Sequence, residues 1–517
     1  MDTILVLDFG SQTTQLISRR IRDRGVFSRV LPGDHALTDD DLEGVKGIVL
    51  SGSPHSVHDE DAPAPSPRVY AEGLPVLGIC YGLQRLVHDH GGVVGTGSHR
   101  EYGPSRQYIE GTAASLYEAI PDGFTSWMSH GDSIVGLPDG AEVISRSENG
   151  LIGTVAFAEG PFIGIQYHPE VSHCDHGSEI LENFALRVCG AKKEWNLERY
   201  REDAREAIRA QVGDRPVLLL ISGGVDSTVA AALLLDALTP DQVHLMYVDT
   251  GLMRHKETAE VTEALKRLGA KQLYIVDAEA RFLEALAGIE DPEEKRKRIG
   301  DLFVEIQATE VSEKISAGYL LAQGTLYTDL IESGKGVGKK ARVIKSHHNV
   351  RTPRIEALRD AGDLLEPLSS LYKDEVRRLG TLLGLPKSIV SRHPFPGPGL
   401  AVRILGEVTK ERCDILRNVD EIYLEEIRAA GLYDEIWQAF AVLLPIRSVG
   451  VRGDDRGYGL VAALRAVISR DGMTADAYDF PPEVLRRIAA RITNRVPEVG
   501  RVVYDVSSKP PSTIEWE

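Results

Sequence analysis

The sequence has few cysteines and no long apolar run. Four cysteines occur in 517 residues and none belongs to a CxxC pair, which argues against a disulfide framework and against a structural zinc site. No stretch approaches the roughly 18–20 uninterrupted apolar residues that a membrane span needs. No basic segment precedes the apolar run at 4–10, as a signal peptide would require. We therefore expect a cytoplasmic protein that binds no membrane.

Positive charge is scarce, above all in the first part of the chain. The whole sequence has 59 basic and 77 acidic residues, and residues 1–192 have 13 basic against 26 acidic. A protein that coats nucleic acid needs a net basic face, so no nucleic-acid partner is expected. The basic residues of the later part form clusters such as 295–298. This distribution of charge is compatible with small anionic substrates that bind in local basic pockets.

Short apolar runs with helical patterns between them predict two successive α/β units. In the first unit these buried-strand patterns lie at 4–10, 47–52, 74–80 and 162–168. In the second unit, where the pattern is typical of a doubly wound parallel sheet, they lie at 216–222, 243–250, 272–278 and 319–325. An amphipathic connecting helix is predicted from apolar residues at helical spacing, namely Leu197, Tyr200, Ala204 and Ile208.

A segment rich in proline and glycine, 393–399, marks a further boundary because it can continue neither a helix nor a central strand. The residues after it mix strand patterns, at 445–451 and 501–506, with helical ones. We therefore predict three domains. Residues 1–192 and 193–392 form two α/β domains, and residues 393–517 form a small α+β domain.

Cys80 stands on a predicted strand-to-helix turn, between glycines at 78 and 82. Such a sharp turn exposes a nucleophile at the carboxyl edge of a sheet, and the flanking glycines relieve crowding. The free N–H groups of the following helix N-terminus stabilise a thiolate. A buried cysteine at a glycine turn can equally be inert packing. Cys174, Cys189 and Cys413 have no comparable setting, and we interpret them as packing.

His168 and Glu170 follow another predicted strand, with a proline between them that keeps the chain extended. A thiolate nucleophile needs a base, and the base needs a third group that fixes its tautomer. Residues 51–53 follow a third strand. Their backbone could supply a second oxyanion N–H beside that of Tyr81.

The segments GICYGLQ, MSHGD and QYHPEV, in this order and spacing, resemble the class I glutamine amidotransferases. The resemblance implies that Cys80 is the nucleophile, His168 the base and Glu170 its orienting partner, and that glutamine releases ammonia through a thioester. It implies oxyanion or glutamine contacts at five further positions: Gly52, Tyr81, Gln84, His130 and Asp132. One departure is Ser53, where the family has glycine; serine tolerates positive φ poorly, which argues against a preformed oxyanion hole.

A second glycine-rich turn, 222–228, lies between a predicted strand and a predicted helix. Its glycines let the backbone wrap round phosphate oxygens at a helix N-terminus. It lacks the GK[ST] ending of a Walker A loop. The alternative is a turn whose side chains only cap the helix.

The sequence SGGVDS in this turn is similar to the pyrophosphate loop of the ATP pyrophosphatases, which cleave ATP between the α- and β-phosphates. The resemblance implies ATP contacts at Ser222, Gly223, Gly224, Val225, Asp226, Ser227 and Thr228. We expect Mg²⁺ with the ATP, Asp226 as a candidate metal contact, and no organic prosthetic group. Val248, at the end of the next strand, lies where adenosine should fall, and Lys345 is expected to reach a phosphate. The adjacent histidines 347–348 cannot share one face, so no metal is expected there.

The third segment carries HPFPGPGLAVR, LPIRSVGVRGDDR, MTADAYDF and VVYDVSSKPPSTIEWE, which resemble the glutamine-hydrolysing GMP synthetases. KRKRIG, QGTLYTDLIES and IKSHHN add to this resemblance, which extends over all 517 residues. It implies amination of XMP to GMP through an adenylated intermediate, with AMP, pyrophosphate and glutamate released, and a homodimer formed through the C-terminal domain. Two departures stand out: residues 350–354 replace a usual VGGLP, and Thr328 replaces a usual proline.

The last ten residues are polar and rich in proline, so a frayed tail is the plainest interpretation. The two prolines also hold the chain extended. Lys509 could then meet a nucleotide phosphate while Glu515 accepts hydrogen bonds from the xanthine ring. The resemblance assigns XMP contact to both residues and to Arg296, whose basic cluster by itself is typical of a solvated helix face.

Two other functions fit parts of this pattern. One is an ATP-dependent amidotransferase with another acceptor, such as a nicotinate dinucleotide, against which the C-terminal KPPSTIEWE argues. The other is a non-catalytic sensor of glutamine or nucleotide, against which the intact Cys80, His168, Glu170 and SGGVDS argue.

Overall fold

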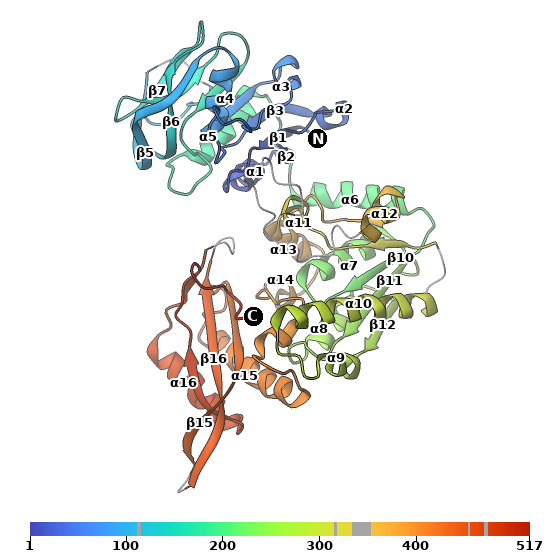
Figure 1. Cartoon of the computed structure of the whole chain (residues 1–517). Coiled ribbons are helices and arrows are strands. Elements are labelled where there is room, and N and C mark those ends of the chain that lie inside the picture. Colours follow the sequence, from blue (N-terminus) through green and yellow to red (C-terminus); the bar gives the residue numbers. More distant parts are fainter. Residues whose placement is uncertain (111–114, 315–317, 333–352, 453–454, 470–473) are drawn as a thin grey trace. The chain divides into compact units, whose positions relative to one another are not determined.

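The computed structural model describes residues 1–110, 115–314, 318–332, 353–452, 455–469 and 474–517 (Figure 1). The chain divides into two compact units. One contains Met1–Tyr200, and the other contains Arg201–Leu330 and the described residues of Asn349–Glu517. Lys345, the segment 344–349 and residues 350–352 of the departing loop lie outside the described residues.

The first unit is built on one nine-stranded sheet. Its parallel part has the order β2 (Phe27–Pro32), β1 (Thr3–Asp8), β3 (Val45–Leu50), β4 (Val76–Ile79) and β9 (Phe162–Ile165). An antiparallel part continues as β8 (Ile152–Ala156), β7 (Glu142–Ser147), β5 (Val93–Ile109) and β6 (Phe124–Gly136). Helices α1 (Thr14–Asp23) and α4 (Tyr81–Asp89) pack on the parallel strands. Because β3, β4 and β9 are parallel neighbours, the residues that follow them meet at one edge of the sheet.

The predicted connecting helix, α6 (Leu197–Val212), starts at the end of the first unit and continues into the second. The first sheet of the second unit has the order β12 (Gln272–Asp277), β11 (Val243–Asp249), β10 (Val217–Ile221), β13 (Leu320–Ala322) and β14 (Leu364–Leu365). All pairings in this sheet are parallel. The helices after these strands include α7 (Val225–Ala237), α8 (Glu257–Arg267), α10 (Pro292–Lys314) and α13 (Lys373–Leu382). The doubly wound arrangement predicted from the apolar runs is confirmed.

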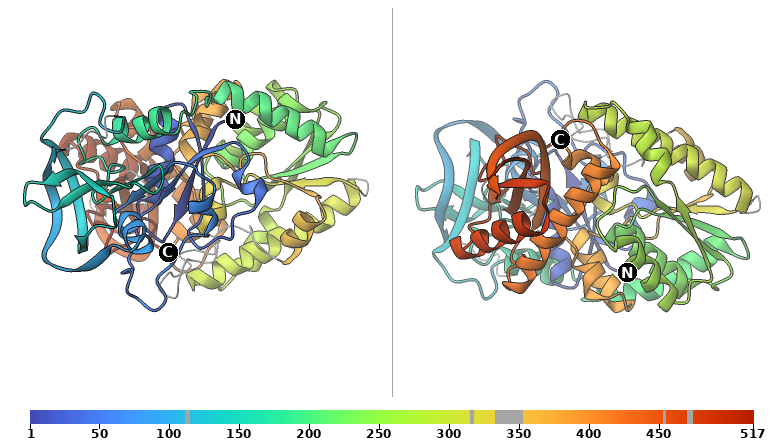
Figure 2. Two further views of the ribbon diagram at one scale, coloured as in Figure 1. Left: turned by 90° about the horizontal axis from the view of Figure 1, so that it is seen from above. Right: turned by 90° about the horizontal axis from the view of Figure 1, so that it is seen from below.

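A second sheet follows the irregular segment 393–398. Its long strands β15 (Gln438–Arg452) and β16 (Asp455–Ile468) pair antiparallel, and β18 (Val499–Tyr504) runs parallel to β16. Helices α15 (Lys410–Ala429) and α16 (Pro482–Arg495) pack beside these strands (Figure 2). One apolar cluster extends from Val248 on β11 through Leu400 to Ile488 on α16. The two sheets of this unit therefore share a continuous core.

Candidate active sites

Cys80 lies on the turn between β4 and α4. Its φ is 53° and its side chain is buried, so a non-glycine residue is held in a strained backbone conformation. The turn fits only because its neighbours lack side chains. A Cβ on Gly78 would overlap the backbone of Gly82, and one on Gly82 would overlap the carbonyl of Leu50. The strain and close packing are those of a turn that presents a nucleophile.

His168 follows β9 and meets Glu170 through a short hydrogen bond. The distance between His168 Nδ1 and Glu170 Oε1 is 2.8 Å, and both side chains are buried. Thr13 Oγ1 donates to the same carboxylate oxygen at 2.6 Å, and Arg20 Nε donates to the Glu170 carbonyl at 3.2 Å. Thr13 and Arg20 were not predicted from the sequence, because neither stands at a recognisable spacing from Glu170. Thr13 fixes the carboxylate that in turn fixes the imidazole, and Arg20 holds the backbone of Glu170.

The charge state of His168 is set by its neighbours. Burial by itself lowers the pKa of His168, but the Glu170 carboxylate and the Cys80 thiol raise it well above its ordinary value. Both neighbours therefore favour the protonated imidazole over the neutral one. A histidine that holds a proton next to a sulfur atom stabilises the thiolate, which is the reactive form of cysteine.

The predicted glutamine and oxyanion residues lie on segments that pass His168 or Cys80. A Cβ on Gly52 would lie 3.3 Å from His168 Cε1, so the backbone after β3 faces the imidazole. Gln84, one turn into α4, donates through Nε2 to the carbonyl of Asp132 at 3.1 Å, and His130 Nδ1 lies 2.9 Å from the same oxygen. Strand β6, which carries His130 and Asp132, also passes Cys80. The Cys80 Sγ is 3.8 Å from the carbonyl of Ser129 on this strand.

The two predicted oxyanion segments can be located as well. The Tyr81 hydroxyl donates to the Pro63 carbonyl at 2.6 Å, so the side chain of Tyr81 has a partner of its own. Ser53 is not among the residues with positive φ. The serine therefore causes no strain in this conformation.

The loop 222–228 connects β10 to α7 and is held by its own hydroxyl groups. The Gly224 carbonyl accepts hydrogen bonds from Ser227 Oγ at 3.2 Å and Thr228 Oγ1 at 2.9 Å, and Ser222 N donates to Ser227 Oγ at 3.3 Å. Gly223 has a φ of 80°, which favours glycine. The loop thus leaves the N-terminus of α7, beginning at Val225, as a backbone cradle of the kind that binds phosphate.

Asp226, in the first turn of α7, is the acidic residue of this loop. Its Oδ2 forms an ion pair with Lys373 of α13, a contact that the sequence did not predict. Its Oδ1 is buried without a hydrogen-bond partner. A buried carboxylate oxygen without a partner fits a cation ligand, so the residue is compatible with Mg²⁺. Val248 lies at the carboxyl end of β11, but its side chain belongs to the apolar core.

The C-terminal tail is anchored rather than frayed. Arg465, fully buried, donates to the carbonyls of Ser507 at 2.6 Å, Thr513 at 3.2 Å and Ile514 at 3.3 Å. The backbone of Lys509 pairs with that of Ala475 in both directions. The interpretation of this segment as a loose tail is therefore wrong.

Buried cations hold the acidic residues of the tail. Arg403 donates to Glu515 Oε1 at 2.8 Å and Oε2 at 3.1 Å, and Gln438 Nε2 donates to Oε1 at 2.7 Å. Arg296 donates to the main-chain oxygen of Glu517 at 2.5 Å, while Lys295 donates to its Oε2 at 2.6 Å. The solvated-face interpretation of 295–298 is wrong for Lys295, whose side chain is 0% exposed. Arg296 and Glu515 thus both lie where the tail meets this unit.

Comparisons with known proteins match three successive segments of the chain. Residues 5–188 match the family model "Glutamine amidotransferase class-I", residues 199–291 match "Asparagine synthase", and residues 425–516 match "GMP synthase C terminal domain". The GMP synthase [glutamine-hydrolyzing] of Aquifex aeolicus is 50% identical over 99% of both chains. That of Phenylobacterium zucineum is 51% identical over 99% of this chain and 98% of its own. The chain belongs to the glutamine-hydrolysing GMP synthase family.

Membership of this family confirms the predicted fold class, with an amidotransferase domain, an ATP-pyrophosphatase domain and a GMP synthase C-terminal domain in that order. The chain is accordingly an enzyme, a ligase that uses the amide nitrogen of glutamine. Within the part of the chain that the structure describes, no helix has the length and apolar character of a membrane span.

Proposed function

We propose that this chain converts XMP, ATP, glutamine and water into GMP, AMP, pyrophosphate and glutamate. One observation carries the proposal. A single chain of the GMP synthase family contains both a strained cysteine beside a His–Glu pair and a loop that can cradle phosphate. The XMP C2 oxygen attacks the α-phosphorus of ATP and pyrophosphate leaves. Ammonia then attacks C2, and AMP departs with the former XMP oxygen.

Ammonia comes from the first unit. Cys80 Sγ attacks the glutamine amide carbon while His168 protonates the leaving nitrogen. Glu170, which is oriented by Thr13, fixes the orientation of the imidazole. The backbone N–H groups at Gly52 and Tyr81 stabilise the oxyanion, and Gln84, His130 and Asp132 shape the glutamine subsite. Water hydrolyses the thioester and releases glutamate.

Adenylation takes place at the loop 222–228. The backbone of Ser222–Thr228 and the α7 N-terminus hold the pyrophosphate oxygens, and Asp226 Oδ1 would hold Mg²⁺ that accompanies ATP and neutralises phosphate charge. Lys373, already paired with Asp226, is placed to meet a phosphate that enters the loop. Lys345 is proposed as a second phosphate contact, and the backbone of Val248 as a contact of the adenosine.

XMP is proposed to bind against the tail, through Arg296, Lys509 and Glu515. The bidentate contact with Arg403 fixes the plane of the Glu515 carboxylate, and with Gln438 also bound to Oε1 it leaves a lone pair on Oε2 for an N–H group of the xanthine ring. Arg296 adds positive charge for the phosphate group. This arrangement supports a purine acceptor.

Three further expectations remain predictions: domain boundaries at 192/193 and 392/393, a cytoplasmic location, and a homodimer. The dimer is supported by apolar side chains that are exposed on β15 and β16, namely Ile446, Val449, Val451 and Tyr458. Exposed apolar residues gathered on one pair of strands are typical of an interface.

The proposal is tested by measuring pyrophosphate release with XMP, with nicotinate dinucleotide or with no acceptor, in the presence of ATP, Mg²⁺ and glutamine. Release only with XMP, matched by an equal amount of GMP, supports the assignment. Release with the dinucleotide would assign the other acceptor, and release with neither would favour the sensor.

A further inference from the structure

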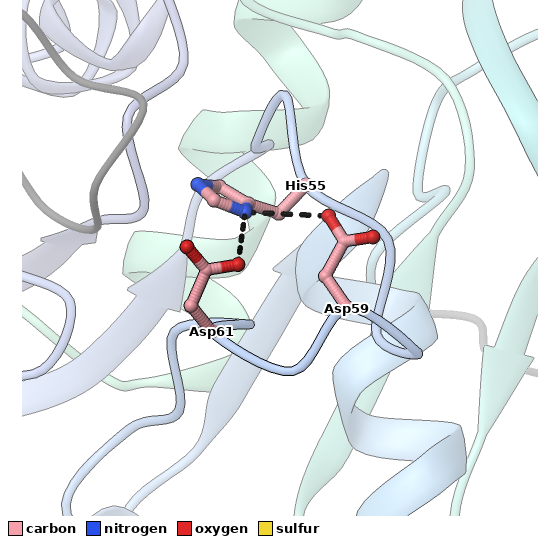
Figure 3. Close-up of side chains that lie close together, drawn as sticks. All are labelled: His55, Asp59 and Asp61. Carbon is pink, nitrogen blue, oxygen red and sulfur yellow. Dashed lines mark ion pairs between the residues drawn. The ribbon is translucent and has the colours of Figure 1, made fainter.

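The loop after β3 carries a histidine whose surroundings neither active site explains. The His55 side chain is 1% exposed, and neither of its ring nitrogens has a hydrogen-bond partner. Its Nδ1 instead faces two carboxylates, at 3.4 Å from Asp59 Oδ2 and 3.9 Å from Asp61 Oδ1 (Figure 3). A polar ring buried in this way is unfavourable unless something binds it.

We propose that His55, Asp59 and Asp61 bind one divalent transition-metal cation of the zinc class, which fixes the loop of residues 53–61 beside the glutamine site. The three ligand atoms all lie within 4.8 Å of one another. Two ligands at about 2.1 Å from a tetrahedral cation are themselves about 3.4 Å apart, which is the separation of His55 Nδ1 and Asp59 Oδ2.

The donor set selects the class of cation. An imidazole nitrogen with two carboxylate oxygens suits Zn²⁺ or Co²⁺, whereas Mg²⁺ and Ca²⁺ prefer oxygen ligands. The two aspartate side chains are 32% and 34% exposed, so the cation can enter from solvent and complete its coordination with water. Asp59 Oδ2 also accepts a hydrogen bond from Ser56 N at 3.2 Å, which fixes the carboxylate that faces the histidine.

The position of this loop gives the cation a role. Ser56 Oγ donates to Asp132 Oδ2 at 2.6 Å, and His55 N donates to Ser53 Oγ at 3.1 Å. The loop therefore connects the oxyanion segment after β3 with the residue that Gln84 and His130 contact. A cation held by three loop residues fixes both ends of this connection and takes no part in bond breaking.

The test is a Co²⁺ titration of the full chain, stripped with a chelator and carrying Cys80→Ser so that the reactive thiol is not a second ligand. Equilibrium dialysis and visible absorption measure the binding, and hydrogen–deuterium exchange follows the loop. We expect one Co²⁺ per chain and slower exchange of residues 53–61 on binding. His55→Asn and Asp61→Asn should each weaken binding at least about tenfold, while His88→Asn, an exposed histidine beside Asp89, should not.

Asp61→Asn keeps the test valid if His55→Asn fails to fold, because Asp61 is partly exposed and the change is conservative. The proposal is overturned if the stripped chain binds no Co²⁺. It is also overturned if both variants bind Co²⁺ as tightly as their parent, or if binding leaves exchange of the loop unchanged.

Discussion

The ion pair between Lys295 and Glu517 joins the end of the chain to the core of the second unit. Lys295 Nζ donates to the Ile404 carbonyl at 2.8 Å and the Ala401 carbonyl at 3.3 Å, as well as to Glu517 Oε2 at 2.6 Å. The Glu517 side chain is 9% exposed. We predict that Glu517→Gln releases the tail, because the buried ammonium then loses its charged partner and faces only neutral acceptors.

The size of this effect follows from the burial of the pair. Removing one partner of a buried ion pair costs about 3–5 kcal/mol. The lower end, about 3 kcal/mol, applies because the carbonyls of Ala401 and Ile404 remain bonded to the ammonium. Since each 1.36 kcal/mol is a factor of ten, the equilibrium for local opening of the tail should rise about 150-fold.

Hydrogen–deuterium exchange measures this opening directly. The amide of Lys509, which donates to the Ala475 carbonyl at 2.7 Å, reports whether the tail is docked. Glu517→Gln should accelerate its exchange about 150-fold, and the double variant Lys295→Met with Glu517→Gln should recover most of the protection. Glu483→Gln, a change at an exposed glutamate of α16, serves as the control. Exchange within about threefold of the parent in Glu517→Gln would refute the reasoning.

The remaining predictions concern the two active sites. Cys80→Ala should lose glutamine-dependent synthesis yet retain synthesis from ammonium salts; loss of both in a folded variant contradicts separate sites. Asp226→Ala should lose synthesis from either nitrogen source, since phosphate positioning serves both, so ammonia-driven synthesis that survives would exclude the role. Glu170→Gln should lower the His168 pKa, because the carboxylate raises it, and so move the alkaline limit of glutaminase activity to lower pH; an unmoved limit would assign that limit to another group.

Features encoded by local pattern could be predicted from the sequence. The apolar runs before Gly52, Cys80 and His168 become neighbouring parallel strands, and that alone brings the three residues to one edge of the sheet. The loop 222–228 likewise follows from its glycines and the flanking strand and helix. In both cases the proposed catalytic or binding residues lie close to a strand end.

Long-range pairings could not be predicted in this way. Thr13 meets Glu170 across 157 residues, and Lys373 meets Asp226 across 147. One local feature of the sequence could have indicated the burial of Lys295. Lys295 shares a helix face with Ile299, four residues further on, and Ile299 is also buried. Charge alone made that face appear solvated, since the acidic partner lies at the other end of the unit's sequence.

The most direct test of the proposed reaction uses XMP labelled with ¹⁸O at C2. If ATP activates that oxygen and ammonia displaces AMP, each GMP formed should be accompanied by one AMP that carries the label in its phosphate group, from glutamine and from ammonium salts alike. Label found in pyrophosphate or in water, with unlabelled AMP, would contradict the adenylated intermediate.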